Sequence, residues 1–319
     1  MRKVKMQKHQ RIVVTGGNGF IGKNFVRLLL ENEYEVVNID KLTYASDKRS
    51  YVSFYNNAKY SFIHDDIAIL ETLPECDVVV NFAAESHVDN SIRSSKHFIT
   101  TNTLGVQNLL DLVRAFEIGL RPVFVQISTD EVYGDIHKGQ SLESDPLKPS
   151  NPYAASKAAA EHILQAYART YGINFQLIRM SNNYGLRQYP EKLIPRSILR
   201  ILSGKTAQIH GDGSYKRNWL HVKEAVQAIK TVIIRGNLNE IYNVSGNIEL
   251  SNLEIIHKIT DLLGLDRNEK IEFVTNRPGQ DTRYAVDDNK IRELGWSATA
   301  NFDDGLEEIV KDAQKNPHW

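Results

Sequence analysis

Two pairs of side chains in this sequence have the types and spacing for acid–base chemistry. The first pair is Asp130 and Glu131, which follow the apolar run at 123–127 after two further residues. Carboxylates confined in one cleft tend to have separated pKa values, so that one can be a protonated acid while its neighbour is an ionised base. For adjacent Asp and Glu in general, a solvated loop pair that caps a helix is the default alternative.

The second pair is Tyr153 and Lys157, in an alanine-rich segment that follows Pro152 and runs to about Tyr171. Proline suits a first helical turn, and residues four apart share one helix face. An ammonium near the phenol, together with a positive nicotinamide, would lower the pKa of Tyr153 enough for it to accept a hydroxyl proton. An incidental surface pair is the alternative, and the dinucleotide-binding motif described next weakens it.

Three glycines, Gly16, Gly19 and Gly22, recur between a predicted strand at 12–15 and a predicted helix that runs to about Leu30. Such a loop can bring backbone N–H groups and a helix N-terminus against a pyrophosphate, although alone it can be a tight turn. Asp40 ends the next predicted strand, where a carboxylate can accept hydrogen bonds from both ribose hydroxyls and repel a 2′-phosphate. We therefore expect NAD rather than NADP, with one complication from the neighbouring Lys41.

The other predicted cofactor contacts follow the glycine loop or later strand ends, because a doubly wound sheet binds its ligand at the carboxyl edge. For Asp66 alone, an N-cap role is at least as good an interpretation. With Tyr153 and Lys157, these contacts are Phe20, Ile21, Lys41, Thr43, Asp66, Ile67, Ala83 and Ala84.

Short β-branched runs alternate with helical patterns up to about residue 184. The runs lie at 12–15, 36–39, 78–82, 123–127 and 175–178. This order predicts an α/β fold, a Rossmann-type doubly wound parallel sheet with a smaller mixed C-terminal lobe. We assign residues 1–184 mainly to the NAD-binding domain, with an N-terminal extension at 1–10, and residues 185–319 mainly to the substrate lobe, and we allow the chain to cross back into the first domain.

Composition excludes several classes of protein. The 319 residues include 39 basic and 39 acidic side chains, so no overall field favours nucleic acid or a membrane surface. The single cysteine cannot form an internal disulfide, and no apolar run has the length of a signal peptide or a membrane span. We expect a cytoplasmic protein with no metal and no nucleic-acid or membrane partner.

Six motifs resemble those of the dTDP-glucose 4,6-dehydratases of the extended short-chain dehydrogenase/reductase group, in order and over nearly the whole chain. They lie at 15–22, 85–89, 128–134, 153–157, 182–185 and 190–195. The Asp130–Glu131 pair discriminates, because epimerases of the same group typically carry small or apolar residues there. The resemblance implies a homodimer that pairs through the segment 100–116 and the helix of Tyr153 and Lys157.

The resemblance also implies a redox-neutral cycle on a nucleotide-diphosphate hexose. Tyr153 takes the proton of the sugar 4-hydroxyl while hydride leaves C4 for NAD⁺, and Thr129 binds the 4-oxygen. Glu131 then removes the proton at C5, and Asp130 protonates the departing 6-hydroxyl. Hydride returns to C6 and gives a 4-keto-6-deoxy sugar.

Substrate contacts are implied by the same resemblance, with Lys192 and Arg217 for the diphosphate. Alone, either cation would be an exposed solubilising charge, and His87 alone would more often be structural. With Glu85 beside them, the implied contacts are Ser86, His87, Thr129, Asn182, Asn183, Lys192, Leu193, Arg217, Arg277 and Asp281.

Several residues depart from the family pattern, and all lie in the substrate lobe. Gln280 stands where histidine is usual, Asn218 where Asp normally follows the arginine, Leu186-Arg187 where Pro-Tyr or Pro-Phe is usual, and Ile248 where the family tends to be polar. A UDP-glucose 4,6-dehydratase or a related epimerase therefore stays open. So does a non-catalytic NAD-binding sensor, which has no need for the four acid–base side chains together.

Overall fold

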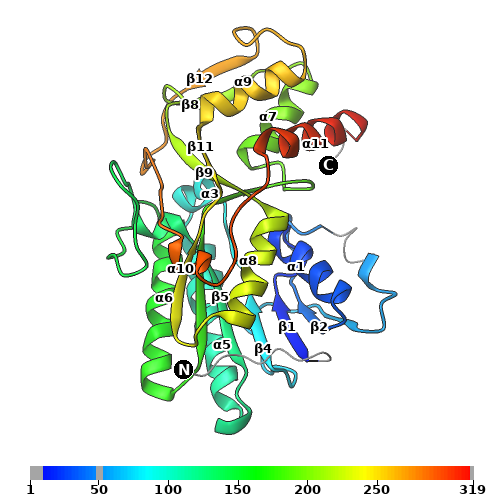
Figure 1. The fold of residues 1–319 in the computed structure, drawn as a ribbon, viewed down its shortest axis with the longest axis vertical. Coiled ribbons are helices and arrows are strands. Elements are labelled where there is room, and N and C mark those ends of the chain that lie inside the picture. The colour runs from blue at the N-terminus through cyan, green and yellow to red at the C-terminus, as the bar shows by residue number, and fades with distance from the viewer. Residues whose placement is uncertain (1–9, 48–52, 317–319) are drawn as a thin grey trace.

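The computed structural model describes residues 10–47 and 53–316, so the N-terminal extension predicted at 1–10 lies almost entirely outside the described residues. Two lobes are stacked along the long axis (Figure 1). The larger lobe contains the main sheet, and the smaller lobe contains α7 (Leu193–Leu202), α9 (Asn252–Leu262) and α11 (Phe302–Lys315).

The main sheet has seven strands, all parallel, in the order β10-β6-β5-β4-β1-β2-β3. The predicted Rossmann-type fold is confirmed, and each of the five predicted strands is present. Their bounds are β1 Arg11–Thr15, β2 Glu35–Ile39, β4 Val78–Asn81, β5 Val123–Thr129 and β6 Phe175–Met180. Two edge strands, β3 Tyr60–Ile63 and β10 Glu240–Val244, were not predicted.

Alternating side chains of the strands build a separate core on each face of this sheet. Ile12 and Val14 face α1 (Phe20–Glu31) and α8 (Val222–Arg235), whereas Val13 faces α5 (Gly105–Ala115) and α6 (Pro152–Tyr171). The strands are therefore covered on both faces, which explains their nearly continuous apolar runs.

The chain leaves the large lobe after β6 and returns to it later. Helix α8 packs beside α1, and β10 then pairs in parallel with β6 to form one edge of the main sheet. The chain returns once more, because Ile291, Trp296 and Ala298 pack in the same core. The large lobe is thus built from three separate stretches of sequence, with parts of the small lobe inserted between them.

The small lobe surrounds its own apolar core. Its strands form two small sheets, and its helices cover them. The elements are β7 Asn182–Tyr184, α7 Leu193–Leu202, β8 Ala207–His210, β9 Lys216–His221, β11 Ile248–Ser251, α9 Asn252–Leu262, β12 Ile271–Val274 and α11 Phe302–Lys315.

Shorter elements lie between the main ones. They are α3 Val88–Arg93, α4 Lys96–Phe98, a π-helical turn Ile99–Leu104, 3₁₀ turns Ile118–Leu120 and Asp130–Tyr133, and α10 Asn289–Arg292. In the described part of the chain, no helix is long and apolar enough to cross a membrane.

Two elements place the predicted acid–base residues. Strand β5 ends at Thr129, so the turn at Asp130–Tyr133 lies at the carboxyl edge of the sheet. Helix α6 begins with Pro152 in its first turn, and the Asn151 side chain caps it by accepting the Ala154 N–H at 2.9 Å. Helix α6 packs against β5, which brings Tyr153 and Lys157 to the same edge.

A fully buried ion pair joins α6 to β6 behind this edge. Arg179 donates to Glu161 at 2.7 and 3.1 Å, and Glu161 also accepts from the Ser128 hydroxyl at 2.5 Å. Removing one partner of a buried pair leaves an uncompensated charge. Glu161→Gln is therefore expected to lower the free energy of unfolding by about 3–5 kcal/mol, measured by urea denaturation.

The matched control is Asp261→Asn, which removes a carboxylate from the surface pair with Arg267, whose side chains are about half exposed. Solvent and salt screen such a pair, so the urea midpoint should not move measurably. Equal effects of the two substitutions would show that burial of the Glu161 pair does not determine its contribution.

Candidate active site

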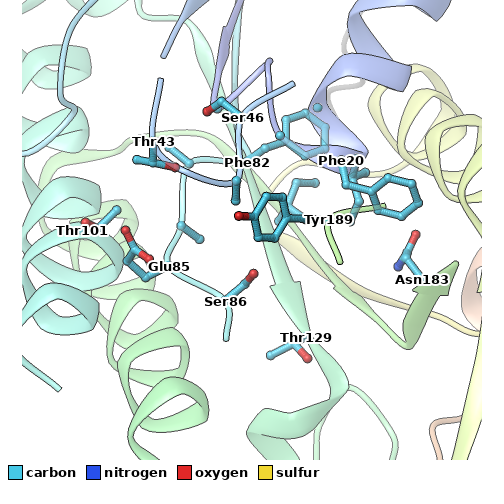
Figure 2. A pocket seen from close by; sticks show the side chains of 18 of the residues that line it. Phe20, Thr43, Ser46, Phe82, Glu85, Ser86, Thr101, Thr129, Asn183 and Tyr189 are labelled. Carbon is cyan, nitrogen blue, oxygen red and sulfur yellow. The ribbon is translucent and has the colours of Figure 1, made fainter. Parts of the chain in front are cut away.

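A cavity of about 290 Å³ crosses the carboxyl edge of the main sheet and is lined by residues of both lobes. Figure 2 shows side chains from segments far apart in the sequence, among them Thr43, Thr129 and Tyr189, converging on it. Its position is the one at which a doubly wound sheet binds a ligand.

The glycine loop forms one wall of the cavity. Gly16 has φ +71°, and a Cβ there would lie 2.6 Å from the Ala83 backbone nitrogen. A Cβ at Gly22 would collide with the Gly16 carbonyl oxygen, and a Cβ at Gly19 would lie 3.2 Å from the same oxygen. Among the described residues, no side chain caps the N-terminus of α1. Its N–H groups and partial positive charge suit a diphosphate, so this cradle fits a dinucleotide.

Asp40 lies at the end of β2 in the same wall and is 7% exposed. It accepts hydrogen bonds from the N–H groups of Asn18 (2.9 Å) and Leu42 (2.7 Å) and from the Ser46 hydroxyl (3.2 Å). A carboxylate offers about four acceptor positions. Asp40 therefore has room for one ribose hydroxyl rather than the two expected from the sequence, unless one of these contacts gives way.

The side chain of Lys41 extends toward Asp66, which follows β3. Its ammonium lies 3.3 Å from both the Asp66 carboxylate and the Thr101 hydroxyl, and the other Asp66 oxygen accepts the Ala68 N–H at 3.0 Å. Asp66 therefore combines the turn-capping role considered from the sequence with a charge pair. Because Lys41 is paired, a 2′-phosphate near Asp40 would meet a carboxylate without a compensating cation.

Every residue predicted to contact the cofactor lines the cavity. Besides those already described, they are Phe20, Ile21, Thr43, Ile67, Ala83, Ala84, Tyr153 and Lys157.

The two adjacent carboxylates occupy different environments. Glu131 lines the cavity, whereas Asp130 is 2% exposed and lies behind it. One Asp130 oxygen accepts the Thr129 hydroxyl at 3.3 Å, and the other has no hydrogen-bond partner within the described residues. Burial, reinforced by the negative charge of Glu131, raises the pKa of Asp130 to about 8. At neutral pH, Asp130 is thus a protonated acid beside a cavity-lining carboxylate.

Tyr153 and Lys157 both line the cavity and are both buried. Lys157 donates to the Ile127 carbonyl at 2.6 Å, and burial lowers its pKa to about 8. Burial raises the pKa of Tyr153, and the charges of Glu131 and Asp130 raise it further. In the protein without NAD⁺, burial and two nearby carboxylates therefore raise the pKa of Tyr153, and the lowering expected from Lys157 together with a bound nicotinamide stays a prediction.

Five of the predicted substrate residues line the cavity: Ser86, Thr129, Asn182, Asn183 and Lys192. Lys192 donates to the Ser86 carbonyl at 2.7 Å, across 106 residues of sequence. Glu85 also lines the cavity, as expected from its position beside Ser86.

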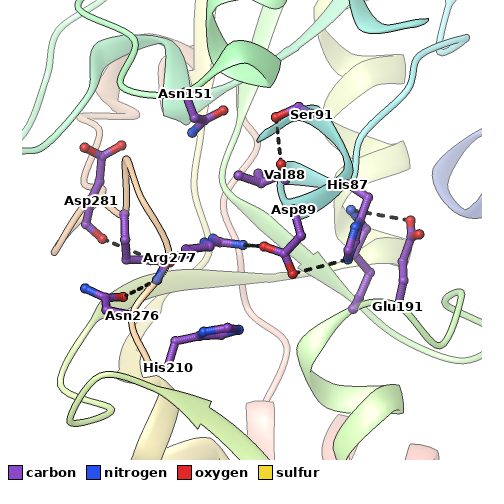
Figure 3. A network of polar contacts seen from close by, with 12 residues as sticks. His87, Val88, Asp89, Ser91, Asn151, Glu191, His210, Asn276, Arg277 and Asp281 are labelled. Carbon is purple, nitrogen blue, oxygen red and sulfur yellow. Dashed lines mark hydrogen bonds and ion pairs between the residues drawn. The ribbon is translucent and has the colours of Figure 1, made fainter. Parts of the chain in front are cut away.

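The other five predicted substrate residues do not line it. Arg277 pairs with Asp89 at 2.7 Å, and His87 lies 4.0 Å from the same carboxylate (Figure 3). The reason is electrostatic, because Asp89 neutralises the arginine that was expected to meet a diphosphate. His87 begins α3, and Leu193 begins α7 and packs on the small-lobe core.

Arg217 and Asp281 belong to a buried network beside the carboxylate pair. Arg217 stacks over the Tyr284 ring, 4.2 Å from its centroid, and donates to the Asp281 carbonyl at 2.9 Å. Asp281 accepts from the hydroxyls of Tyr284 (2.6 Å) and Ser150 (2.5 Å). Arg217 and Asp281, which were expected to bind substrate, are thus hydrogen-bonded to other groups of the protein.

Two residues next to Glu131 were not predicted from the sequence. The Tyr284 hydroxyl and the Asn151 amide each lie 3.5 Å from its Oε2 atom. Asn151 was detectable as the polar residue before Pro152, but no sequence signal places Tyr284 beside a carboxylate 153 residues earlier. Other cavity residues that were missed are Ser46, Thr101, Gln188, Tyr189 and Glu191.

This sheet, its glycine loop and the Tyr-x-x-x-Lys pair define a dinucleotide-binding protein of the short-chain dehydrogenase/reductase type. The chain belongs to the GDP-mannose 4,6 dehydratase family, whose profile matches residues 13–309.

Relatives within this family are similar over nearly their full length. The chain is 44% identical to the low-salt glycan biosynthesis protein Agl12 of Haloferax volcanii, covering 94% of this chain and 97% of that protein. It is 43% identical to a dTDP-glucose 4,6-dehydratase of Neisseria gonorrhoeae, covering 95% of each. The resemblance drawn from the motifs is confirmed.

Solved structures agree. DesIV of Streptomyces venezuelae, a dTDP-glucose 4,6-dehydratase with NAD and TYD bound, has a TM-score of 0.91 at 41% identity, covering 96% of this chain and 97% of that one. A UDP-glucuronic acid 4-epimerase of Bacillus cereus has nearly the same fold, with a TM-score of 0.90, at 27% identity and covering 96% and 99%. The fold is thus common to both activities, and the difference must lie in the side chains of the site.

Proposed function

We propose that the protein is an NAD-dependent hydro-lyase that converts dTDP-glucose to dTDP-4-keto-6-deoxyglucose. The observation that carries this proposal is the pair of carboxylates at the end of β5, of which Asp130 is buried with a raised pKa and Glu131 lines the cavity together with Tyr153. The names of two relatives, at 43% and 41% identity, support the same reaction.

The residues that would hold NAD are those of the glycine cradle, Asp40, and the cavity-lining strand ends. NAD⁺ bound there would supply a hydride acceptor for C4, a hydride donor for C6, and a positive charge beside Tyr153. The paired state of Lys41 and the carboxylate of Asp40 favour NAD over NADP.

The acid–base roles follow from the environments of four side chains. Tyr153 accepts the proton of the sugar 4-hydroxyl, and the Thr129 hydroxyl beside it holds the 4-oxygen. Once C4 is a ketone, the proton on C5 is acidic. Glu131 removes that proton, and Asp130 donates its own to the departing 6-hydroxyl, which leaves as water.

The test is turnover of dTDP-glucose by purified protein without added reductant. We expect a 4-keto-6-deoxy product by NMR and no net NADH by absorbance. Parallel assays with UDP-glucose and with the N-acetylhexosamine counterparts of both substrates determine the nucleotide and the sugar. Net NADH would indicate a dehydrogenase, a 4-epimer would indicate an epimerase, and tight NAD binding without any turnover would favour the non-catalytic alternative.

The pH dependence follows from Asp130. Its raised pKa means that the acid is protonated below about pH 8 and loses its proton above it. Lys157 loses its positive charge in the same range, because its pKa is lowered to about 8. The rate constant for water loss, measured in single turnovers, should therefore fall above about pH 8, and a flat profile to pH 9.5, about 1.5 units higher, would contradict the acid assignment.

The proposal includes a cytoplasmic homodimer that pairs through the segment 100–116 and α6. It is supported by two exposed apolar side chains, Ile99 (43% exposed) directly before this segment and Leu104 (50% exposed) within it. Analytical ultracentrifugation should give a dimer for the protein and a monomer for Leu104→Glu.

A further inference from the structure

Two loops from different lobes meet over the cavity. The first, residues 41–47, follows β2 and contributes Thr43, Ala45 and Ser46 to the lining; the second, residues 185–192, joins β7 to α7 and contributes Gln188, Tyr189 and Glu191. Figure 2 shows Thr43, Ser46 and Tyr189 around the cavity.

The outer contact between these loops involves Tyr44. Its ring meets the Tyr189 ring edge-on, with centroids 5.3 Å apart, and its hydroxyl donates to Glu191 at 3.1 Å. Tyr44 is half exposed, so this contact is open to water. It can therefore form and break at low cost.

The inner contact is a buried lysine. Lys23 lies in the first turn of α1 and is 3% exposed. Its ammonium donates to the Asp47 carboxylate at 2.8 Å, in the first loop, and to the Arg187 carbonyl at 2.9 Å, in the second. Burial lowers the pKa of Lys23, and the Asp47 charge opposes that effect. A desolvated ammonium needs such partners, so separating the loops leaves Lys23 unsatisfied.

The second loop is shaped for this contact. Arg187 has φ +64°, a left-handed conformation that is strained for a side chain other than glycine, and its carbonyl points to Lys23. Its guanidinium lies 3.5 Å from Asp312 of α11. Arg187 is also one of the departures from the family pattern noted in the sequence. Through Arg187, Lys23 of α1 is therefore linked to Asp312 of α11.

The same lysine is tied to the diphosphate cradle. Its backbone N–H bonds to the Gly19 carbonyl at 3.0 Å, and the Asp47 N–H bonds to the Asn18 carbonyl at 2.8 Å. Lys23 therefore joins three segments around the cavity: the glycine loop and the two covering loops. Residues of both loops line the cavity, so a dinucleotide bound there would lie against them.

We propose that Lys23 is a retention residue, which holds both loops closed over the bound dinucleotide and so keeps it in the cleft between turnovers. This inference rests on the dinucleotide part of the proposed function. It assigns to Lys23 an effect on dissociation of the dinucleotide and no part in the acid–base steps.

The test measures release of NADH from the full-length protein. NADH-loaded protein is mixed with excess NAD⁺, and loss of bound-NADH fluorescence is followed in a stopped-flow instrument. Lys23→Met should release NADH at least roughly tenfold faster, because the charge that joins the loops is gone. Arg27→Met, an exposed cation one turn further along the same helix, is the matched control and should release at the parent rate.

Asp47→Asn provides a second measurement if Lys23→Met does not fold, since it keeps the shape of the loop and removes the ion pair. It should also release NADH faster than the parent protein. The melting temperature of each variant, measured without dinucleotide, shows whether the variant is folded. Parent-rate release by a folded Lys23→Met, or by Asp47→Asn if Lys23→Met does not fold, would overturn the retention role while leaving the proposed function intact. Failure of the parent protein to bind NADH would instead overturn the proposed cofactor and the inference with it.

Discussion

Glu131→Gln is expected to lower the rate of product formation by roughly two to four orders of magnitude. The amide keeps the size of the side chain and its hydrogen-bond contacts with Asn151 and Tyr284, but it cannot take the proton from C5. Oxidation at C4 does not need Glu131, because Tyr153 accepts the proton of the 4-hydroxyl in that step. In a single turnover with dTDP-glucose, bound NAD⁺ should therefore still be partly reduced, as absorbance at the NADH band would detect.

The control for this substitution is Glu117→Gln, the same change at an exposed position outside the cavity, which should leave the rate unchanged. Undiminished product formation by Glu131→Gln would refute its assignment as the base. Loss of both NAD reduction and product would place Glu131 in the oxidation step or in binding instead.

Tyr153→Phe should lower the rate by a similar factor, roughly two to four orders of magnitude, but at an earlier step. Without the phenol, the proposed acceptor for the proton of the 4-hydroxyl is missing, so the ketone that acidifies C5 should not form. Single-turnover absorbance should show no reduction of bound NAD⁺, which distinguishes this variant from Glu131→Gln.

Tyr171→Phe is the matched control on the same helix, since its ring packs against Tyr167 and Arg114 away from the cavity. It should keep parent activity. If Tyr153→Phe reduced NAD⁺ at the parent rate, the proton acceptor for the 4-hydroxyl would have to be another group.

Periodicity and end signals predicted most of the large lobe. Helix α6 was predictable because proline, the alanine-rich run and the Gly172 C-cap all favour one helix. Strand β10 was not, because its sequence Glu-Ile-Tyr-Asn-Val has no long apolar run, and only pairing with β6 stabilises it as a strand. This pairing involves residues more than 60 positions earlier in the chain, which a local sequence pattern does not reveal.

In the candidate site, too, positions that follow from the local pattern were predicted, and contacts between distant segments were not. Residues at strand ends and in the glycine loop were placed correctly in the cavity, since parallel strands fix which edge they share. Arg277 and Arg217 were not, because a charged side chain in a loop takes whichever partner the fold brings near, here Asp89 and the Tyr284 ring. Their roles in substrate binding stay predictions.

The return of the chain to the main sheet makes the two lobes inseparable. A fragment that stops at residue 184 would lack α8 and β10, and so would bare the edge of β6 and a broad apolar face of the sheet. During synthesis, the large lobe therefore cannot complete its core until α8 and β10 have been made, whereas the small lobe has a core of its own.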